Sequence, residues 1–198
     1  MNTKWMNLAV GLGMAVGLAG CASKQALVPD VQQQVDADGK KTITVAAEKV
    51  QCSRPQCPEL GASWHSAKPG QAVLSIRLPY QQSAVTGADF HFGAQTVLRV
   101  RSRAQSQPQS PTAPTTAFDV PLQTMERIAT APVSWMRVYT ADGGSVDEHI
   151  STGEEGSPAF SAMHYFMNSV LAAGGQGAGG AMNQGGLMDR LGLSDKKR

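Results

Sequence analysis

The sequence has few charged side chains, few aromatic side chains and almost no excess charge of either sign. Asp, Glu, Lys and Arg make up 16% of its 198 residues, and Phe, Trp and Tyr make up 6%. The 17 basic residues nearly balance the 15 acidic ones, so the formal net charge is +2. A nucleic-acid-binding domain typically carries a marked basic excess, so we expect no nucleic-acid partner.

Long apolar runs are also scarce, and the longest lies near the start of the chain. Residues 8–20 are apolar or small and follow a single charged residue, Lys4. A helix of that length rises about 20 Å, whereas the hydrocarbon core of a bilayer is about 30 Å thick. The run is therefore too short for a permanent membrane span and is typical of a secretory signal.

The end of this run carries a recognisable pattern, Gly17-Leu18-Ala19-Gly20-Cys21. It resembles the lipobox of bacterial lipoprotein precursors. The resemblance implies that residues 1–20 are a signal peptide and that acyl chains are attached to the sulfur and new amino terminus of Cys21. In such lipoproteins an Asp after the cysteine favours the inner membrane, so Ala22 implies the periplasmic face of the outer membrane. The alternative is an ordinary signal peptide with a cysteine at its cleavage edge.

Cysteine is rare, and acylation of Cys21 would leave only Cys52 and Cys57. An even number of cysteines in an oxidising compartment indicates a disulfide, and Pro55 favours a turn between the two. Closing so short a loop contributes about 2 kcal/mol in the chain-entropy model. The alternatives are free thiols or a metal site that also uses His65, although typical zinc sites have a second cysteine pair.

The composition of the chain divides it into segments. Residues 21–40 are polar without apolar periodicity, so we expect a flexible tether. Residues 41–173 form a single β-rich domain, interrupted by a long exposed loop over the Pro-rich segment 104–115. Residues 174–198 are rich in Gly and end in a short basic sequence, so we expect a disordered tail.

Alternating apolar residues predict short strands in the domain, clearest over 72–78, where Leu74 and Ile76 share a face. A hairpin joins 133–140 to 145–151 through Asp142-Gly143-Gly144. Ser157 and Pro158 predict the start of an amphipathic helix over 158–173, with Gly174 after its end. The fold class is therefore mainly β (α+β): an antiparallel sheet or sandwich of about six to seven short strands with a C-terminal helix packed on it. The other strand segments are 42–47, 89–92, 96–103 and 116–120, and 122–130 has one or two helical turns.

Two groups of residues are candidates for binding a partner. Arg99, Arg101 and Arg103 alternate along one segment and form a basic row on a strand, which Arg77 could extend. Trp135 and Tyr139 share a face with Arg137 between them. Such a face is either an exposed binding platform or part of the core, and we favour the core.

Catalytic motifs are missing. No Gly-x-Ser-x-Gly nucleophile elbow occurs, and Glu154 and Glu155 are neighbours ahead of a helix, where they complement its N-terminus. We therefore expect no enzymatic activity, no cofactor and no metal. The exception to consider is His149, whose ring Asp147 could orient from two residues away on the same strand face.

These observations favour a membrane-anchored envelope lipoprotein that acts as a non-enzymatic accessory or structural module, or as a module that binds an envelope protein or glycan. One alternative is a lipid or small-molecule carrier with a cavity between sheet and helix. The other is a periplasmic hydrolase that uses His149 and Asp147, which would need a Ser or Cys nucleophile close to His149.

Overall fold

The computed structural model describes residues 28–81, 83–94, 96–102 and 115–176, which form two antiparallel sheets and two helices. Sheet A has the order β1-β2-β3-β4-β7 and sheet B the order β6-β5-β8-β9. Sheet A contains β1 (Val31–Val35), β2 (Lys41–Lys49), β3 (Glu59–His65), β4 (Gln71–Arg77) and β7 (Thr115–Pro121). Sheet B contains β5 (Val85–Phe92), β6 (Thr96–Arg101), β8 (Val133–Thr140) and β9 (Ser145–Thr152). The helices are α1 (Leu122–Thr130) and α2 (Pro158–Ala172).

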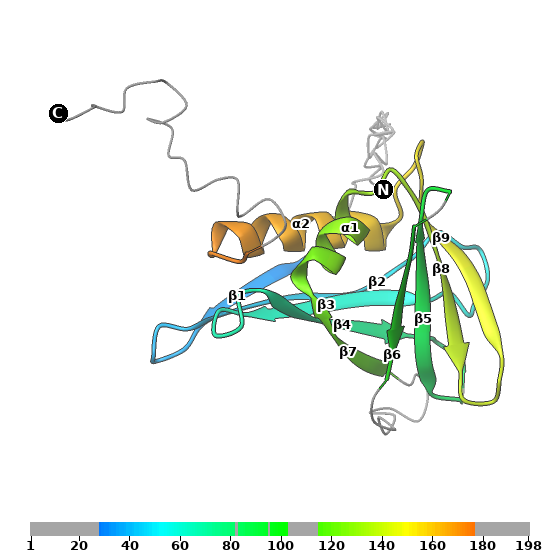
Figure 1. The fold of residues 1–198 in the computed structure, drawn as a ribbon, viewed down its shortest axis with the longest axis horizontal. Helices are drawn as coiled ribbons and strands as arrows, with labels where there is room; N and C mark the ends of the chain where they lie inside the picture. The colour runs from blue at the N-terminus through cyan, green and yellow to red at the C-terminus, as the bar shows by residue number, and fades with distance from the viewer. Residues whose placement is uncertain (1–27, 82, 95, 103–114, 177–198) are drawn as a thin grey trace, which may run out of the picture.

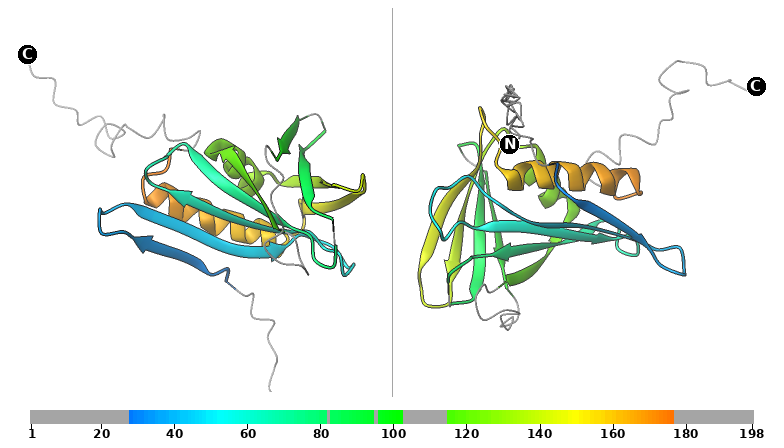
Figure 2. Two further views of the ribbon diagram at one scale, coloured as in Figure 1. Left: turned by 90° about the horizontal axis from the view of Figure 1, so that it is seen from below. Right: turned by 180° about the vertical axis from the view of Figure 1, so that it is seen from behind.

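The two helices cover one face of sheet A, and sheet B stands at one end of that sheet with its strands running across those of sheet A (Figure 1). Neither described helix lies on the other face of sheet A, as the view from below shows (Figure 2). A hydrogen bond from Thr116 Oγ1 in β7 to the carbonyl of Val85 in β5, 2.9 Å long, joins the two sheets. The arrangement confirms the predicted mainly β fold with a C-terminal helix packed on a sheet.

The core lies between sheet A and the helices and continues onto the inner face of sheet B. Leu74 and Ile76 on β4 are fully buried there, as their alternation predicted, and each such side chain contributes about 1.5 to 3 kcal/mol. The apolar stripe of α2 faces the same core. Its buried members are Ala159, Ala162, Met163, Phe166, Met167 and Val170.

The ends of α2 confirm the predicted signals. The Ser157 side chain accepts a hydrogen bond from the Phe160 amide at 3.1 Å, and Pro158 occupies the first helical position. Gly174 follows the C-cap with a φ of +100°. The amide of Gly175 then donates to the carbonyl of Val170, which completes a Schellman motif.

The prediction of a tether through residue 40 is wrong for Val31–Val35, which form β1 and pair with β2. β3 was not predicted at all, and six to seven strands is too low because the described residues contain nine. β1 is an edge strand with mostly exposed side chains, so it needs no apolar alternation. β3 contains Gly61, a residue type with poor strand propensity. Glycine permits close packing at this position, because a Cβ there would lie 2.6 Å from Ser75 Oγ.

Several predicted segments fall outside the described residues. These include the signal peptide over 1–20, the loop over 104–115 apart from Thr115, which begins β7, and the tail over 174–198 apart from its first three residues. Their predictions therefore stay predictions.

The predicted disulfide is present, with the Cα atoms of Cys52 and Cys57 5.9 Å apart. The short loop that it closes lies against the outer strand of sheet B. The Gln51 amide donates to the carbonyl of His149 at 2.8 Å, and Arg54 Nη2 lies 2.7 Å from Glu148 Oε1. The alternatives of free thiols or a metal site at these cysteines are therefore wrong, and the loop instead ties the end of β2 to β9.

Candidate binding face on sheet B

The register of sheet B places twelve residues in three rows on the face that points away from the core, which we call the outer face. The middle row alternates basic and acidic residues across all four strands. The rows are Val97, His91, Trp135 and His149; Arg99, Asp89, Arg137 and Asp147; and Arg101, Gly87, Tyr139 and Ser145.

An aromatic stack occupies the first row. The rings of His91 on β5 and Trp135 on β8 lie parallel, with centroids 3.6 Å apart and planes 6° from each other. The guanidinium of Arg137 lies 5.8 Å from the centroid of Trp135, within the range of a cation–π contact. Trp135 is thus held between two neighbours while it remains half-buried, so its position is fixed before any ligand arrives.

Asp89 lies at the centre of the polar contacts and is only 6% exposed. Its carboxylate is 2.8 Å from Arg101 Nη2, and it accepts a 3.0 Å hydrogen bond from the Tyr139 hydroxyl. Arg99 Nε lies farther away, at 3.6 Å. Burial by itself would raise the pKa of Asp89, but the close contact with the Arg101 guanidinium, the hydrogen bond from Tyr139 and the charge of Arg99 together outweigh it and hold this pKa below its usual value.

A glycine allows Arg101 to cross the sheet. The side chain of Arg101 passes over Gly87 on β5 and places its guanidinium 4.9 Å from the centroid of Tyr139 on β8. A Cβ at Gly87 would lie 2.7 Å from Arg101 Cδ and 2.6 Å from the Val100 carbonyl oxygen. A larger residue would therefore displace the arginine from both Asp89 and Tyr139.

Arg137 and Asp147 form a second ion pair across the β8–β9 hairpin. Arg137 donates to both carboxylate oxygens of Asp147, and its Nε lies 2.7 Å from Oδ1. This pair lowers the pKa of Asp147 and raises that of Arg137. Because the Asp147 carboxylate is directed at Arg137, the structure does not place it on His149 as a hydrolase would require.

The groove beside His149 likewise lacks a nucleophile in the part of the chain that is described. It has a volume of about 300 Å³ and is lined by Trp135, Asp147, Glu148 and His149, none of which is a Ser or Cys. Glu154 and Glu155 do not converge on this groove, and Glu155 instead lies 3.5 Å from the amide of the Gln51 side chain. The residues that carried the hydrolase alternative are therefore not assembled as that mechanism needs.

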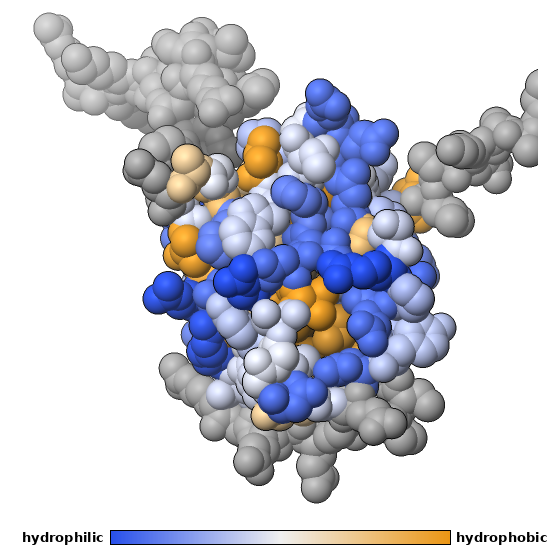
Figure 3. Space-filling model, turned by 90° about the vertical axis from the view of Figure 1, so that its right-hand side faces the viewer, coloured by the Kyte–Doolittle hydropathy of each residue, from blue (hydrophilic) through white to orange (hydrophobic). Residues whose placement is uncertain are grey.

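Two cations of the outer face are much more accessible than the carboxylate that they contact. The side chains of Arg99 and Arg101 are 69% and 49% exposed, whereas that of Asp89 is 9% exposed. Arg137 and Asp147, which pair with each other, are about equally exposed, at 42% and 44%. The view toward β8 and β9 shows mostly hydrophilic side chains around a small hydrophobic area (Figure 3). A molecule that approaches this face meets guanidinium groups and aromatic edges before it meets Asp89.

The structure brings together four of the five predicted partner-binding residues, Arg99, Arg101, Trp135 and Tyr139. Arg103 lies outside the described residues. The interpretation of Trp135 and Tyr139 as core residues is wrong, because both are half-buried on the outer face and Met136 and Val138 fill the core instead.

One residue predicted for this face lies elsewhere, and two residues that contribute to it were not predicted. Arg77 does not extend the basic row, because it lies on sheet A, 3.5 Å from Glu59. Asp89 and His91 were not predicted as site residues. Their signal was present, since the predicted strands 89–92 and 96–103 flank Gly93-Ala94 and a hairpin there brings Asp89 opposite Arg99.

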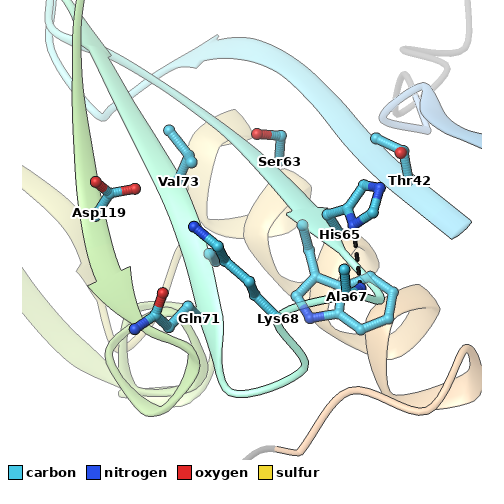
Figure 4. Close-up of a pocket in the computed structure, with 10 residues that line it drawn as sticks. Thr42, Ser63, His65, Ala67, Lys68, Gln71, Val73 and Asp119 are labelled. Atoms are coloured by element: carbon cyan, nitrogen blue, oxygen red, sulfur yellow. Dashed lines mark hydrogen bonds between the residues drawn. The ribbon is translucent and has the colours of Figure 1, made fainter. Parts of the chain in front are cut away.

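A second hollow lies on the helix-free face of sheet A and has a volume of about 440 Å³. Thr42, Ser63, Val73 and Asp119 line it from four neighbouring strands, and Lys68 extends beside it from the turn after β3 (Figure 4). This hollow is open to solvent on the outside of sheet A. It is not the cavity between sheet and helix that a carrier would require.

Neither a metal site nor a membrane-spanning helix is found among the described residues. No group of three His, Cys, Asp or Glu residues there could hold a metal ion. Neither described helix is long and apolar enough to cross a membrane. Comparison with protein-family models, curated proteins and solved structures finds no match to this chain.

Proposed function

We propose that this chain is a lipid-anchored lipoprotein of the bacterial outer membrane, on its periplasmic face, and that it binds another envelope component through the outer face of sheet B. The anchoring part of the proposal depends on the lipobox-like residues that end at Cys21. The binding part depends on the arrangement of side chains on sheet B.

The observation that carries the binding proposal is an exposed set of aromatic and arginine side chains held in fixed positions. Trp135 is stacked on His91, and Arg101 is held by Asp89 and Tyr139. Fixed side chains lose little conformational entropy on binding, and Trp, Tyr and Arg are the residues that most often dominate binding energy. A non-enzymatic partner-binding module therefore accounts for this face without a catalytic centre.

The charges on this face favour a partner with anionic groups. Arg99 is the most exposed of the three arginines, and among the described residues the only carboxylate close to it is the buried Asp89 at 3.6 Å. Its guanidinium is therefore free to form a bidentate contact with a carboxylate or phosphate from outside. We infer that the partner, whether an envelope protein or glycan, presents acidic groups to β6.

Site-specific photo-crosslinking in living cells tests this proposal. A photo-reactive amino acid replaces Val97, which is 43% exposed on the same face as Arg99 and two residues away. The matched control carries it at Ala117, which is also exposed but lies on sheet A. We expect an envelope protein or glycan adduct at position 97 and none at position 117.

The dependence of this adduct on charge makes the test specific. Arg99→Gln removes one cation but leaves Asp89 with Arg101 and Tyr139, so the face keeps its other contacts. We expect the adduct at position 97 to decrease at least several-fold in this variant and to weaken as salt increases. Equal adducts at both positions, or an adduct that Arg99→Gln does not reduce, would contradict the proposal.

A further inference from the structure

β1 presents an open and unprotected strand edge. It pairs with β2 on one side, and no strand of the described residues pairs with its other side. Figure 2 shows β1 as the outermost strand of sheet A. Natural edge strands are usually protected by charged residues or proline, but Val31-Gln32-Gln33-Gln34-Val35 contains neither.

The hydrogen-bonding groups that face outward on β1 follow from its register with β2. Asp36 donates its amide to the carbonyl of Lys40 at 2.8 Å, which makes these two residues a hydrogen-bonded pair at the end of the hairpin. Such pairs alternate in an antiparallel ladder, and β1 and β2 pair without a bulge. The amides and carbonyls of Val31, Gln33 and Val35 therefore point away from β2, toward the open edge.

The sequence of β1 is the same in both directions about Gln33. A second copy of the chain can therefore lie antiparallel to it with Gln33 opposite Gln33 and Val31 opposite Val35. In this register all three outward-facing residues form hydrogen-bonded pairs, and Gln32 lies opposite Gln34. If one copy shifted by one residue, the outward-facing amides and carbonyls of the two strands would no longer lie opposite each other. If it shifted by two residues, valine and glutamine side chains would no longer lie opposite their own kind.

The exposed valine at the end of β1 agrees with this register. Val31 and Val35 lie on the same face of the strand. Val31 lies opposite the buried Val45, whereas Val35 is 59% exposed. Pairing would place Val35 of each copy beside Val31 of the other copy. The apolar surface that β1 leaves in solvent would then be covered by an identical segment.

We propose that β1 pairs with β1 of a second copy of this chain to form a two-fold symmetric dimer. The five strands of sheet A in each copy join into one continuous ten-stranded sheet. The self-complementary sequence makes the interface isologous, as closed dimers require. This interface lies on sheet A and does not depend on the binding face of sheet B.

Cysteine crosslinking of the full chain in membranes tests the register. In Gln33→Cys the two new cysteines face each other with Cα atoms about 5.5 Å apart, within the range of a disulfide. In the matched control Gln32→Cys they are diagonal neighbours, about 7–8 Å apart, which is too far. We expect a covalent dimer with Gln33→Cys but not with Gln32→Cys or the unsubstituted chain.

A second pair of substitutions extends the same test. Position 32 of one copy lies opposite position 34 of the other, so the double variant Gln32→Cys, Gln34→Cys should crosslink although Gln32→Cys alone does not. Equal yields from Gln33→Cys and Gln32→Cys, or no crosslink from Gln33→Cys, would overturn the proposed pairing.

Gln33→Pro separates loss of the dimer from loss of the fold. Proline removes the outward amide of residue 33 but no hydrogen bond to β2, which is where edge strands tolerate proline. We expect sedimentation of the full chain in detergent to give a dimer for the unsubstituted chain and a monomer for Gln33→Pro, with unchanged circular dichroism. A dimer in both chains, or a monomer in both, would overturn the proposal.

Discussion

At the scale of single residues, Asp89 determines how the outer face of sheet B is held together. Its buried carboxylate contacts Arg101 and Tyr139 from the strands on either side of β5. Hydrogen bonds to a charged group contribute about 1.5 to 3 kcal/mol, and a buried carboxylate that loses them is costly. The stability of this face should therefore depend on the charge of Asp89.

Asp89→Asn should lower the free energy of unfolding by about 1 to 3 kcal/mol at pH 7. The pKa of Asp89 is lower in the folded chain than in the unfolded chain, where it is about 3.9. The charged side chain therefore makes its full contribution to the free energy of unfolding above the unfolded pKa. This contribution is lost as the pH falls through the folded pKa. The difference between the variant and the unsubstituted chain should therefore shrink below about pH 4. Urea unfolding at pH 7 and pH 3 measures it.

Asp119→Asn is the matched control for this prediction. Asp119 is an exposed carboxylate on sheet A, with no ion pair in the part of the chain that is described. Its substitution should change the unfolding free energy by less than about 0.5 kcal/mol at either pH. If Asp89→Asn changed the free energy of unfolding at pH 7 as little as this control, Asp89 would not organise the outer face as we describe.

Trp135 shows what the sequence could and could not reveal about single residues. The predicted alternation of β8 correctly separated Trp135 and Tyr139 from Met136 and Val138, but it did not say which set faces inward. Aromatic bulk favoured the wrong set. The signal that identifies the outer face is Arg137, which the correctly predicted hairpin places opposite Asp147. An ion pair across a hairpin indicates the solvent side more reliably than side-chain size does.

At the scale of elements, the close approach of β5 and β6 depends on Gly87. Gly87→Ala should destabilise the fold by about 1 to 3 kcal/mol, because its Cβ would meet the Val100 carbonyl oxygen at 2.6 Å and displace Arg101. Gly70→Ala is the control, since no atom lies within 4 Å of a Cβ at that position. Thermal unfolding of both variants measures the difference. Equal midpoint temperatures would show that β6 can shift to accommodate the Cβ of residue 87 without loss of stability.

The elements that were predicted correctly are those whose signal is local. Ser157 and Gly174 mark the ends of α2, and apolar alternation marks β4. β1 and β3 could not be predicted this way, because they form by pairing with neighbouring strands and their own sequences carry no local strand signal. β3 is stabilised by pairing with β2 and β4 on both sides despite Gly61, and β1 is polar because it lies at an edge.

At the scale of the whole molecule, the proposed lipid anchor at Cys21 determines where the chain can act. Each buried CH₂ group contributes roughly 0.8 kcal/mol, so a single acyl chain binds only reversibly while two or three on one cysteine hold firmly. Neither described helix can substitute for them as a membrane span. Attachment of the domain to the membrane should therefore depend on one thiol.

Cys21→Ala should move the protein, once its signal is cleaved, from the membrane fraction to the soluble fraction of the envelope. Cys52→Ala is the matched control, because it also removes one cysteine but leaves the lipobox-like residues intact, and it should stay with the membrane. Mass spectrometry of the unsubstituted protein should show an acylated Cys21 at its amino terminus. A mature terminus without acyl chains, or a fully processed Cys21→Ala chain that remains with the membrane, would mean that a different feature attaches this protein.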